Sequence, residues 1–208
     1  MILARRTALL GLPLLAGCSV FPDRPYVEVL RYPLQPVRGT VRAPARPPRR
    51  TLLVRLLRSA PGTELRGLRT IRADGTERLD PYAEWAAPPA ELIEEAARRW
   101  LAGAGLFAGV VAPGTRARPD LVLECEVTAL EADLRNGQAR AGLAAVLLAE
   151  SPSGGDGRLL GQWAVSGGAP LAASTDPHGP PPGAIATACT EALAGALTAL
   201  ENAIAPFA

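Results

Sequence analysis

The sequence has few of the residues that catalytic and metal-binding sites require. It contains one histidine, His178, and no lysine, because all 22 basic residues are arginine. His178 stands in a stretch rich in proline and glycine, away from any cysteine or acidic cluster, so nucleophilic catalysis with a histidine base is not indicated. No Cys/His or Asp-rich spacing predicts zinc or calcium, and no glycine-rich loop predicts phosphate binding. We therefore expect a protein that is not an enzyme and that holds no metal and no dissociable cofactor.

Cysteine is scarce as well, and three cysteines are too few for a fold held together by disulfides. Cys125 falls on the apolar face of a predicted strand, and Cys189 lies inside a predicted helix. We expect two separate buried thiols. A disulfide between them is the alternative, and the sequence does not supply the geometry that decides it.

Neither sign of charge is in clear excess. The 22 arginines stand against 20 acidic residues, which is a formal net charge of +2. Two of those arginines, Arg5 and Arg6, lie in the first segment, and without them the chain is neutral. This balance argues against a nucleic-acid partner.

An apolar run opens the chain, in "MILARRTALLGLPLLAGC". It has about ten apolar residues after the two arginines, whereas a membrane-spanning helix needs about 20, so it predicts a secretory signal peptide. The last four residues, Leu15 to Cys18, resemble the bacterial lipobox. That resemblance implies cleavage between Gly17 and Cys18, an S-diacylglycerol group on the Cys18 sulfur, and a fatty acyl chain such as palmitate on its new amine.

Two other interpretations of this segment stay open: an ordinary signal peptide that happens to contain a cysteine, and an uncleaved membrane anchor. The arginine pair also bears a weak resemblance to a twin-arginine signal. Ser19, rather than an aspartate, follows Cys18, which favours the outer membrane of a Gram-negative bacterium over retention in the inner membrane. We divide the chain into a signal peptide (1–17), a lipidated tether (18–25) and one domain (26–208).

Strand patterns occur on both sides of a central helical segment. Alternating apolar and polar residues over 120–133, 138–150 and 158–167, joined by turn sequences, predict an antiparallel meander. In its first strand, Glu124 and Glu126 fall on the polar face, where we expect solvated carboxylates. The earlier strand candidates are 26–34, 51–60, and a hairpin over 68–79 whose turn is Asp74-Gly75.

Two helices are predicted. Pro88 and Pro89 are typical of a helix start, an apolar face follows, and Gly103 or Gly105 ends the segment. The second helix runs from about 184 to 205 with a leucine-rich stripe. Together these elements predict an α+β fold: a single domain with a mostly antiparallel sheet and two main helices packed on one face.

Two surface features are candidate contact sites. The segment 33–50 is rich in proline and arginine, and its residues Arg42, Arg46, Arg49 and Arg50 could contact lipid phosphates, although a solvated loop is the simpler interpretation. Tyr82 and Trp85 stand between the hairpin and the first helix. They could contact a partner, and packing in the core or the turn is the alternative.

The order of several motifs resembles the ABC-type transport auxiliary lipoprotein component family, which includes the outer-membrane lipoprotein of the paraquat-inducible operon. The resemblance covers most of the chain after Cys18, and the arginine-proline loop and "DPHGPPPG" depart from it. The motifs that carry it are "YPL", "TLLVRLL", "LRTIR", "YAEWAAPPAELIEEAARRWLAGAGLFAGVV", "RPDLVLECEVTALEAD" and the alanine-rich final helix.

The resemblance implies a non-catalytic component of a lipid transport system that links the two membranes. Such a protein sits on the periplasmic face of the outer membrane, in contact with its lipid. Its partners are a mammalian-cell-entry (MCE) domain protein and, through it, an ABC permease and ATPase. Association of several copies into a homo-oligomer is a further expectation. Only Cys18 carries over as a defined functional residue.

Two other functions stay open. The domain could be a periplasmic scaffold or regulator that activates an envelope enzyme, in which case a cell-wall synthase gene would be its neighbour. It could also carry lipid itself, which requires an apolar cavity between the helices and the sheet.

Overall fold

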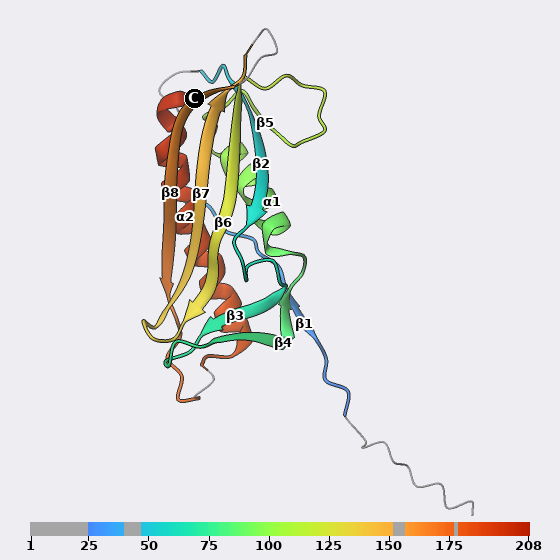
Figure 1. Ribbon diagram of the computed structural model, residues 1–208, viewed down its shortest axis with the longest axis vertical. Coiled ribbons are helices and arrows are strands. Elements are labelled where there is room, and N and C mark those ends of the chain that lie inside the picture. The colour runs from blue at the N-terminus through green and yellow to red at the C-terminus, as the bar shows by residue number, and fades with distance from the viewer. Residues whose placement is uncertain (1–24, 40–46, 152–156, 177–178) are drawn as a thin grey trace, which may run out of the picture.

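One long strand, β6 (Leu121–Asp133), lies at the centre of the sheet (Figure 1). The structure is a computed structural model, and it describes residues 25–39, 47–151, 157–176 and 179–208. Side chains alternate along β6, so that Leu121, Leu123 and Cys125 are buried on its inner face while Glu124 is half-buried on the outer face. This alternation is the one predicted from the sequence.

On one side of β6 the chain forms an antiparallel meander. The strand β7 (Gln138–Ala149) pairs with β6 over its whole length, and β8 (Arg158–Pro170) pairs with β7 in the same way. The turn between β6 and β7 contains Gly137 at a φ of 62°, a conformation that favours glycine. The predicted meander is confirmed.

The other side of β6 is divided between two strands that are parallel to it. Strand β2 (Thr51–Ser59) pairs with the first half of β6, and β3 (Gly67–Ile71) pairs with its last two residues. The sheet is therefore mixed, although its longest pairings are antiparallel. These parallel pairings join segments more than 60 residues apart, and local sequence patterns contain no signal for them.

The predicted hairpin consists of β3 and β4 (Glu77–Trp85). In its turn the Asp74 carboxylate accepts hydrogen bonds from the backbone N–H and the hydroxyl of Thr76, at 2.9 and 2.7 Å, and Gly75 has a φ of 88°. Two three-residue strands complete the sheet: β1 (Leu30–Tyr32) is parallel to β4, and β5 (Gly109–Val111) is parallel to β2.

Helix α1 (Pro89–Gly103) begins after Pro88, as predicted. A proline at the first position of a helix loses no hydrogen bond, because the N–H groups of the first turn have no partner within the helix. On the outer face of α1, Glu94 forms an ion pair with Arg98 at 3.5 Å and Glu95 with Arg99 at 3.6 Å. Such pairs stabilise a helix by about 0.2–0.5 kcal/mol each.

Helix α2 (Pro182–Ile204) continues into a short 3-10 turn, η1 (Ala205–Phe207). By length and composition, 182–207 could cross a membrane, but half of its most apolar window is buried inside the domain. Its apolar stripe faces the core: Leu193, Leu197 and Leu200 have no exposed surface. Burial of each such side chain stabilises the fold by about 1.5–3 kcal/mol.

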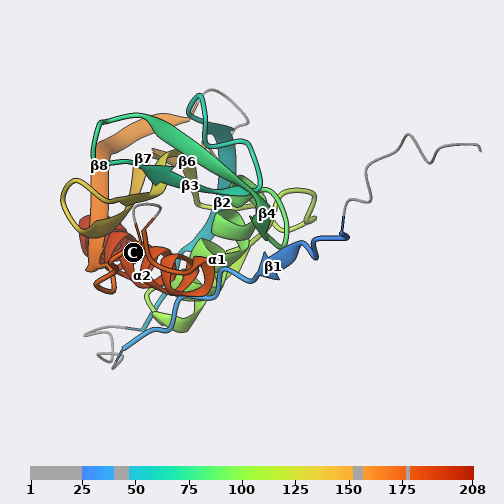
Figure 2. The same ribbon diagram turned by 90° about the horizontal axis from the view of Figure 1, so that it is seen from below.

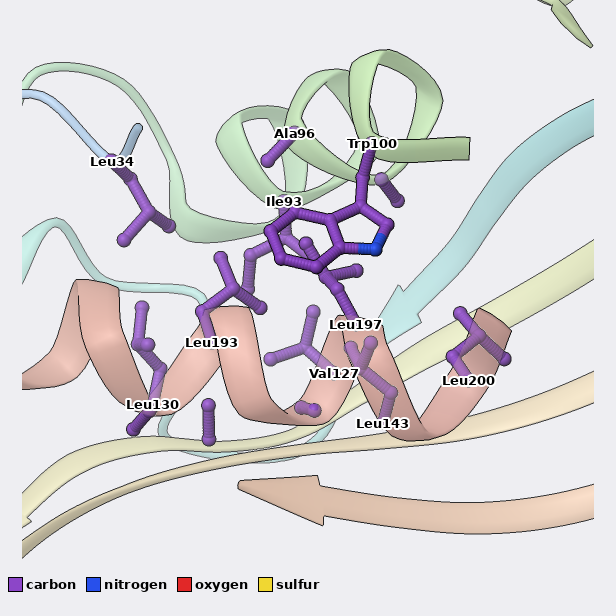
Figure 3. Close-up of a cluster of buried hydrophobic side chains, with 14 of the residues drawn as sticks. Leu34, Ile93, Ala96, Trp100, Val127, Leu130, Leu143, Leu193, Leu197 and Leu200 are labelled. Carbon is purple, nitrogen blue, oxygen red and sulfur yellow. The ribbon is translucent and has the colours of Figure 1, made fainter. Parts of the chain in front are cut away.

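Both helices lie on the inner face of the sheet, as Figure 2 shows from below. Helix α1 packs on β2, β5 and β6, while α2 packs mainly on β8 and β7. The close-up in Figure 3 shows side chains from α1, α2 and the sheet meeting in one cluster along α2. A single α+β domain with two main helices on one face is confirmed.

A glycine contact sets the distance between α2 and the edge of the meander. A Cβ atom added to Gly167 of β8 would lie 2.1 Å from the carbonyl oxygen of Ala192, and one added to Gly195 would lie 3.3 Å from the Gly167 Cα. Helix and strand backbones are thus in direct contact here, which only glycine permits.

Candidate functional site

The N-terminal strap, residues 33–39, crosses the outer side of both helices (Figure 2). Leu34 is only 1% exposed, so the strap contributes to the core. Farther along, the Arg38 guanidinium donates two hydrogen bonds of 2.6 Å to the Glu201 carboxylate of α2. It also donates to the Trp100 carbonyl oxygen at 3.0 Å and lies 5.3 Å from the centre of the Trp100 ring.

The indole N–H of Trp100 donates to the same Glu201 carboxylate, at 2.9 Å. One acid of α2 is therefore shared by an arginine of the strap and a tryptophan of α1. Both charged side chains are less than 20% exposed, so solvent screens their attraction less than that of a surface pair. Arg38 belongs to the segment 33–50, for which the sequence predicts a solvated loop. The sequence gives no signal for this cluster, because Glu201 is 163 residues away.

The predicted anchor lies outside the described residues. This holds for Gly17 and Cys18, and also for Arg42, Arg46 and His178. The first described segment, 25–29, extends from the lower end of the molecule in Figure 1, where Tyr26 is 89% exposed. Lipidation of Cys18 stays a prediction, and the segment that leads to it lies on the surface.

The two described arginines of the predicted headgroup site lie at the other end of the molecule. Arg49 and Arg50 are exposed and precede β2, at the upper end of the sheet in Figure 1. Arg50 donates a hydrogen bond of 2.7 Å to the carbonyl oxygen of Phe207. Because 25–29 leaves from the lower end, these arginines face away from the start of the tether.

Tyr82 and Trp85 differ in exposure although both belong to β4. Tyr82 is 50% exposed, whereas Trp85 is 1% exposed and belongs to the core. The backbone N–H of Trp85 donates to the carbonyl oxygen of Arg66 at 2.7 Å, which continues the pairing with β3. Trp85 therefore packs in the core, which was the alternative to a partner contact. For Tyr82, a partner contact stays a prediction.

Cys125 and Cys189 are both buried and free, so no disulfide joins them. Burial, with a smaller contribution from the Glu124 charge, raises the pKa of Cys125 to about 12. Burial, followed by the charge of Glu131, raises the pKa of Cys189 to about 12 as well. Thiols with such pKa values are protonated at neutral pH and are poor nucleophiles.

A buried acidic pair stands on the outer face of β6, near its end. Glu131 is 7% exposed and has Arg69 and Arg140 at 3.5 and 3.8 Å. Asp133 has no exposed surface, and Arg140 lies 3.5 Å from it. Arginines thus compensate both carboxylates, which indicates a structural ion-pair network rather than a pair poised for acid–base chemistry.

Asp133 also accepts hydrogen bonds from the turn that follows β6. Burial raises its pKa, but the side-chain hydrogen bonds from Arg135 and Asn136, at 3.3 and 2.8 Å, outweigh burial and lower the pKa of Asp133 to about 2. The carboxylate is therefore ionised at neutral pH.

The remaining acids of the described residues form no metal site. No group of three or more His, Cys, Asp or Glu side chains comes together in the part of the chain that the structure describes. Glu124, one of the two acids expected to be solvated on β6, forms an ion pair with Arg55 of β2.

Two surface hollows flank helix α2. One of about 410 Å³ lies between α2 and the strap, and it is lined by Tyr32, Val37 and Ala194 among others. The second, of about 330 Å³, lies between the start of α2 and the β3–β4 hairpin, where Arg78 and Asp80 contribute. Both open to solvent beside the helix. The space between the helices and the sheet is filled by the side chains shown in Figure 3.

No family model and no curated protein sequence matches the chain. Two solved structures, however, have a similar fold. Protein XCC0632 from Xanthomonas campestris, described under the family DUF330, has a TM-score of 0.64 and 23% identity, covering 83% of this chain and 94% of that protein. An uncharacterized protein has a TM-score of 0.62 and 12% identity, covering 85% and 99%. At these identities the likeness shows the fold alone.

Proposed function

We propose that this protein is a lipoprotein of the outer membrane, anchored through Cys18 on the periplasmic face. In this proposal it is a non-catalytic auxiliary component of an MCE-type ABC system that moves lipid between the membranes. Its partners are the MCE-domain protein and, through it, the permease and the ATPase. The observation that carries the proposal is the lipobox, followed by a domain whose ordered motifs resemble the auxiliary lipoproteins.

The position of the first described residues supports an anchoring role. The segment 25–29 extends from the surface, so the tether can leave the domain without opening the core. The strap then joins this exit point to both helices through Leu34 and Arg38. A pull on the anchor is thereby transmitted to the core of the domain rather than to a loose terminus.

The chemistry of the described residues supports a non-catalytic role. The two cysteines are buried and protonated, and the most buried acids on β6 are held by arginines. The filled space between helices and sheet also favours anchoring over direct carriage of a lipid, because an acyl chain would have to displace core side chains.

Membrane anchoring is tested by labelling cells with radioactive palmitate and separating their membranes by density. We expect the wild-type protein to carry label and to fractionate with the outer membrane. The Cys18→Ala variant should be unlabelled and lose the outer-membrane fraction, while Ser19→Ala serves as the matched control and should behave as wild type. A Cys18→Ala variant that keeps label and location would refute the lipid anchor.

The transport role is tested by co-purification with an MCE-domain protein of the same organism. We expect the detergent-solubilised lipoprotein to retain the MCE-domain protein. We also expect that deletion of the lipoprotein gene makes cells more sensitive to membrane-damaging compounds. Absence of association, or a cell-wall synthase as the retained partner, would favour the scaffold alternative instead.

A further inference from the structure

Five arginines belong to segments that meet at one end of the sheet. In Figure 1 this is the upper end, the end farthest from the segment 25–29. The pairing register places them together: Leu52 is opposite Leu121, Leu121 opposite Ala149, and Ala149 opposite Arg158. Residues just outside these positions therefore share one end of the molecule. The loop 112–120, which joins β5 to β6, lies at the same end (Figure 1). The arginines are Arg49, Arg50, Arg116, Arg118 and Arg158, and all five are exposed. We call this surface the basic end.

The arginines of the basic end differ from those in the rest of the structure. Ten other arginines that the structure describes each form an ion pair with an acid. Arg49, Arg116, Arg118 and Arg158 form none with the described residues. Arg50 forms no ion pair with them either, and its side chain donates to the Phe207 carbonyl oxygen. Among the arginines elsewhere whose side chains the structure describes, Arg72 also lacks an ion pair, and it lies beside the turn of the β3–β4 hairpin at the other end.

Few acids offset the positive charge of the basic end. Of the described residues there, Asp120 and Glu150 are acidic, and Asp120 accepts a hydrogen bond from the backbone N–H of Thr51 at 2.7 Å. Leu159, next to Arg158, is 58% exposed and adds an apolar contact. The chain as a whole is near neutral, so this surplus is local.

We propose that the basic end is the docking surface for an acidic protein surface, with carboxylates that pair with Arg116, Arg118 and Arg158. Guanidinium groups form bidentate hydrogen bonds with carboxylates, and a surface on which the described arginines outnumber the described acids steers an oppositely charged partner. The proposal rests on the proposed function, because it assigns the face that meets the MCE-domain protein.

Lipid headgroups of the anchoring membrane fit this end less well than a protein does. The tether from Cys18 to Tyr26 spans at most about 28 Å when extended, whereas the 13 residues of β6 alone span about 43 Å. Since the tether starts from the lower end, the basic end faces away from that membrane and toward the periplasm.

The test compares two charge-matched triple variants of the full-length lipoprotein. The basic-end variant is Arg116→Gln, Arg118→Gln, Arg158→Gln. The control is Arg31→Gln, Arg78→Gln, Arg99→Gln, which removes three ion-paired surface arginines elsewhere. The probes are the periplasmic part of the MCE-domain protein, and vesicles that contain phosphatidylglycerol, each titrated at low and high salt.

We expect the basic-end variant to bind the MCE-domain protein about tenfold more weakly and with a flatter salt dependence, while the control binds as wild type. Equal binding by both variants would overturn the docking surface and leave the proposed function standing. No binding by wild type would overturn both. A loss confined to the vesicles would assign the basic end to anionic lipid and refute a protein partner.

Discussion

At the scale of single residues, the Arg38–Glu201–Trp100 cluster is what holds the strap in place. Its members come from the strap, α2 and α1, and each hydrogen bond in it joins two of these elements. No local sequence pattern predicts the cluster, because its three residues are far apart in the chain. Trp100 lies on the apolar face predicted for the first helix, and the sequence gives no local signal for the polar contact of its indole N–H.

Replacing Arg38 by Met should destabilise the domain by about 1–3 kcal/mol, because Glu201 then keeps its charge in a mostly enclosed site with only the Trp100 N–H as donor. Urea unfolding measures this loss. In a double-mutant cycle, Arg38→Met and Glu201→Met should couple. The double variant should lose less free energy of unfolding than the sum of the losses of the two single variants. Arg99→Met, at an exposed pair, is the control and should cost less than about 0.5 kcal/mol. Strict additivity would contradict a cooperative cluster.

The acid Asp133 predicts a pH dependence. Its folded-state pKa of about 2 lies below the value of about 3.9 in unfolded chains, so ionised Asp133 stabilises the fold above pH 4 and this contribution is lost as the pH falls toward 2. Asp133→Asn should therefore be less stable than wild type at pH 7, by about 1–2 kcal/mol. The difference should shrink between pH 4 and pH 2. Melting curves recorded between pH 2 and pH 7 measure this difference in stability. Glu126→Gln, on the same strand, is the control. A stability difference between wild type and Asp133→Asn that does not change with pH would contradict the prediction.

At the scale of elements, the contact between α2 and β8 depends on the absence of a side chain at Gly167. The neighbouring Gly168 points to the other face of the sheet, where an added Cβ would lie 3.4 Å from the Gln138 side-chain oxygen. Two adjacent glycines thus occupy sites with very different space. Sequence patterns show both as glycines in a strand and do not distinguish them.

Gly167→Ala should destabilise the domain by about 1–3 kcal/mol, since α2 must move away from β8 to admit the new Cβ. Gly168→Ala is the matched control, and its effect should stay within about 0.5 kcal/mol. Thermal unfolding followed by circular dichroism measures both. Similar melting temperatures for the two variants would show that α2 does not lie as close to β8 as the structure has it.

At the scale of the whole molecule, the chain has two unlike ends. The anchor segment leaves the lower end in Figure 1, and arginines that form no ion pair with the described residues lie at the upper end. The strap crosses the outer side of the helices (Figure 2). This arrangement suits a domain that is held to a membrane at one end and presents the other to a partner.

Truncation tests how far the strap belongs to the fold. A chain that starts at residue 26 keeps β1 and the strap and should be as stable as a chain that starts at Cys18. A chain that starts at residue 40 loses Leu34 and Arg38, and we expect a loss of about 3–5 kcal/mol in urea unfolding. Equal stability of the two chains would mean that the strap rests on the surface and transmits no force.

The sequence by itself determined the elements and their faces. The period-2 patterns located β6, β7 and β8, the period-3.6 patterns located α1 and α2, and the Asp74-Gly75 pair located the hairpin, because these signals act between residues close in the chain. The lipobox, also local, predicted the anchor. Only the tertiary structure decided the parallel neighbours of β6, the role of Arg38 and the gathering of unpaired arginines at one end. Each of these depends on contacts between distant segments, and their geometry exists only once the helices have packed on the sheet.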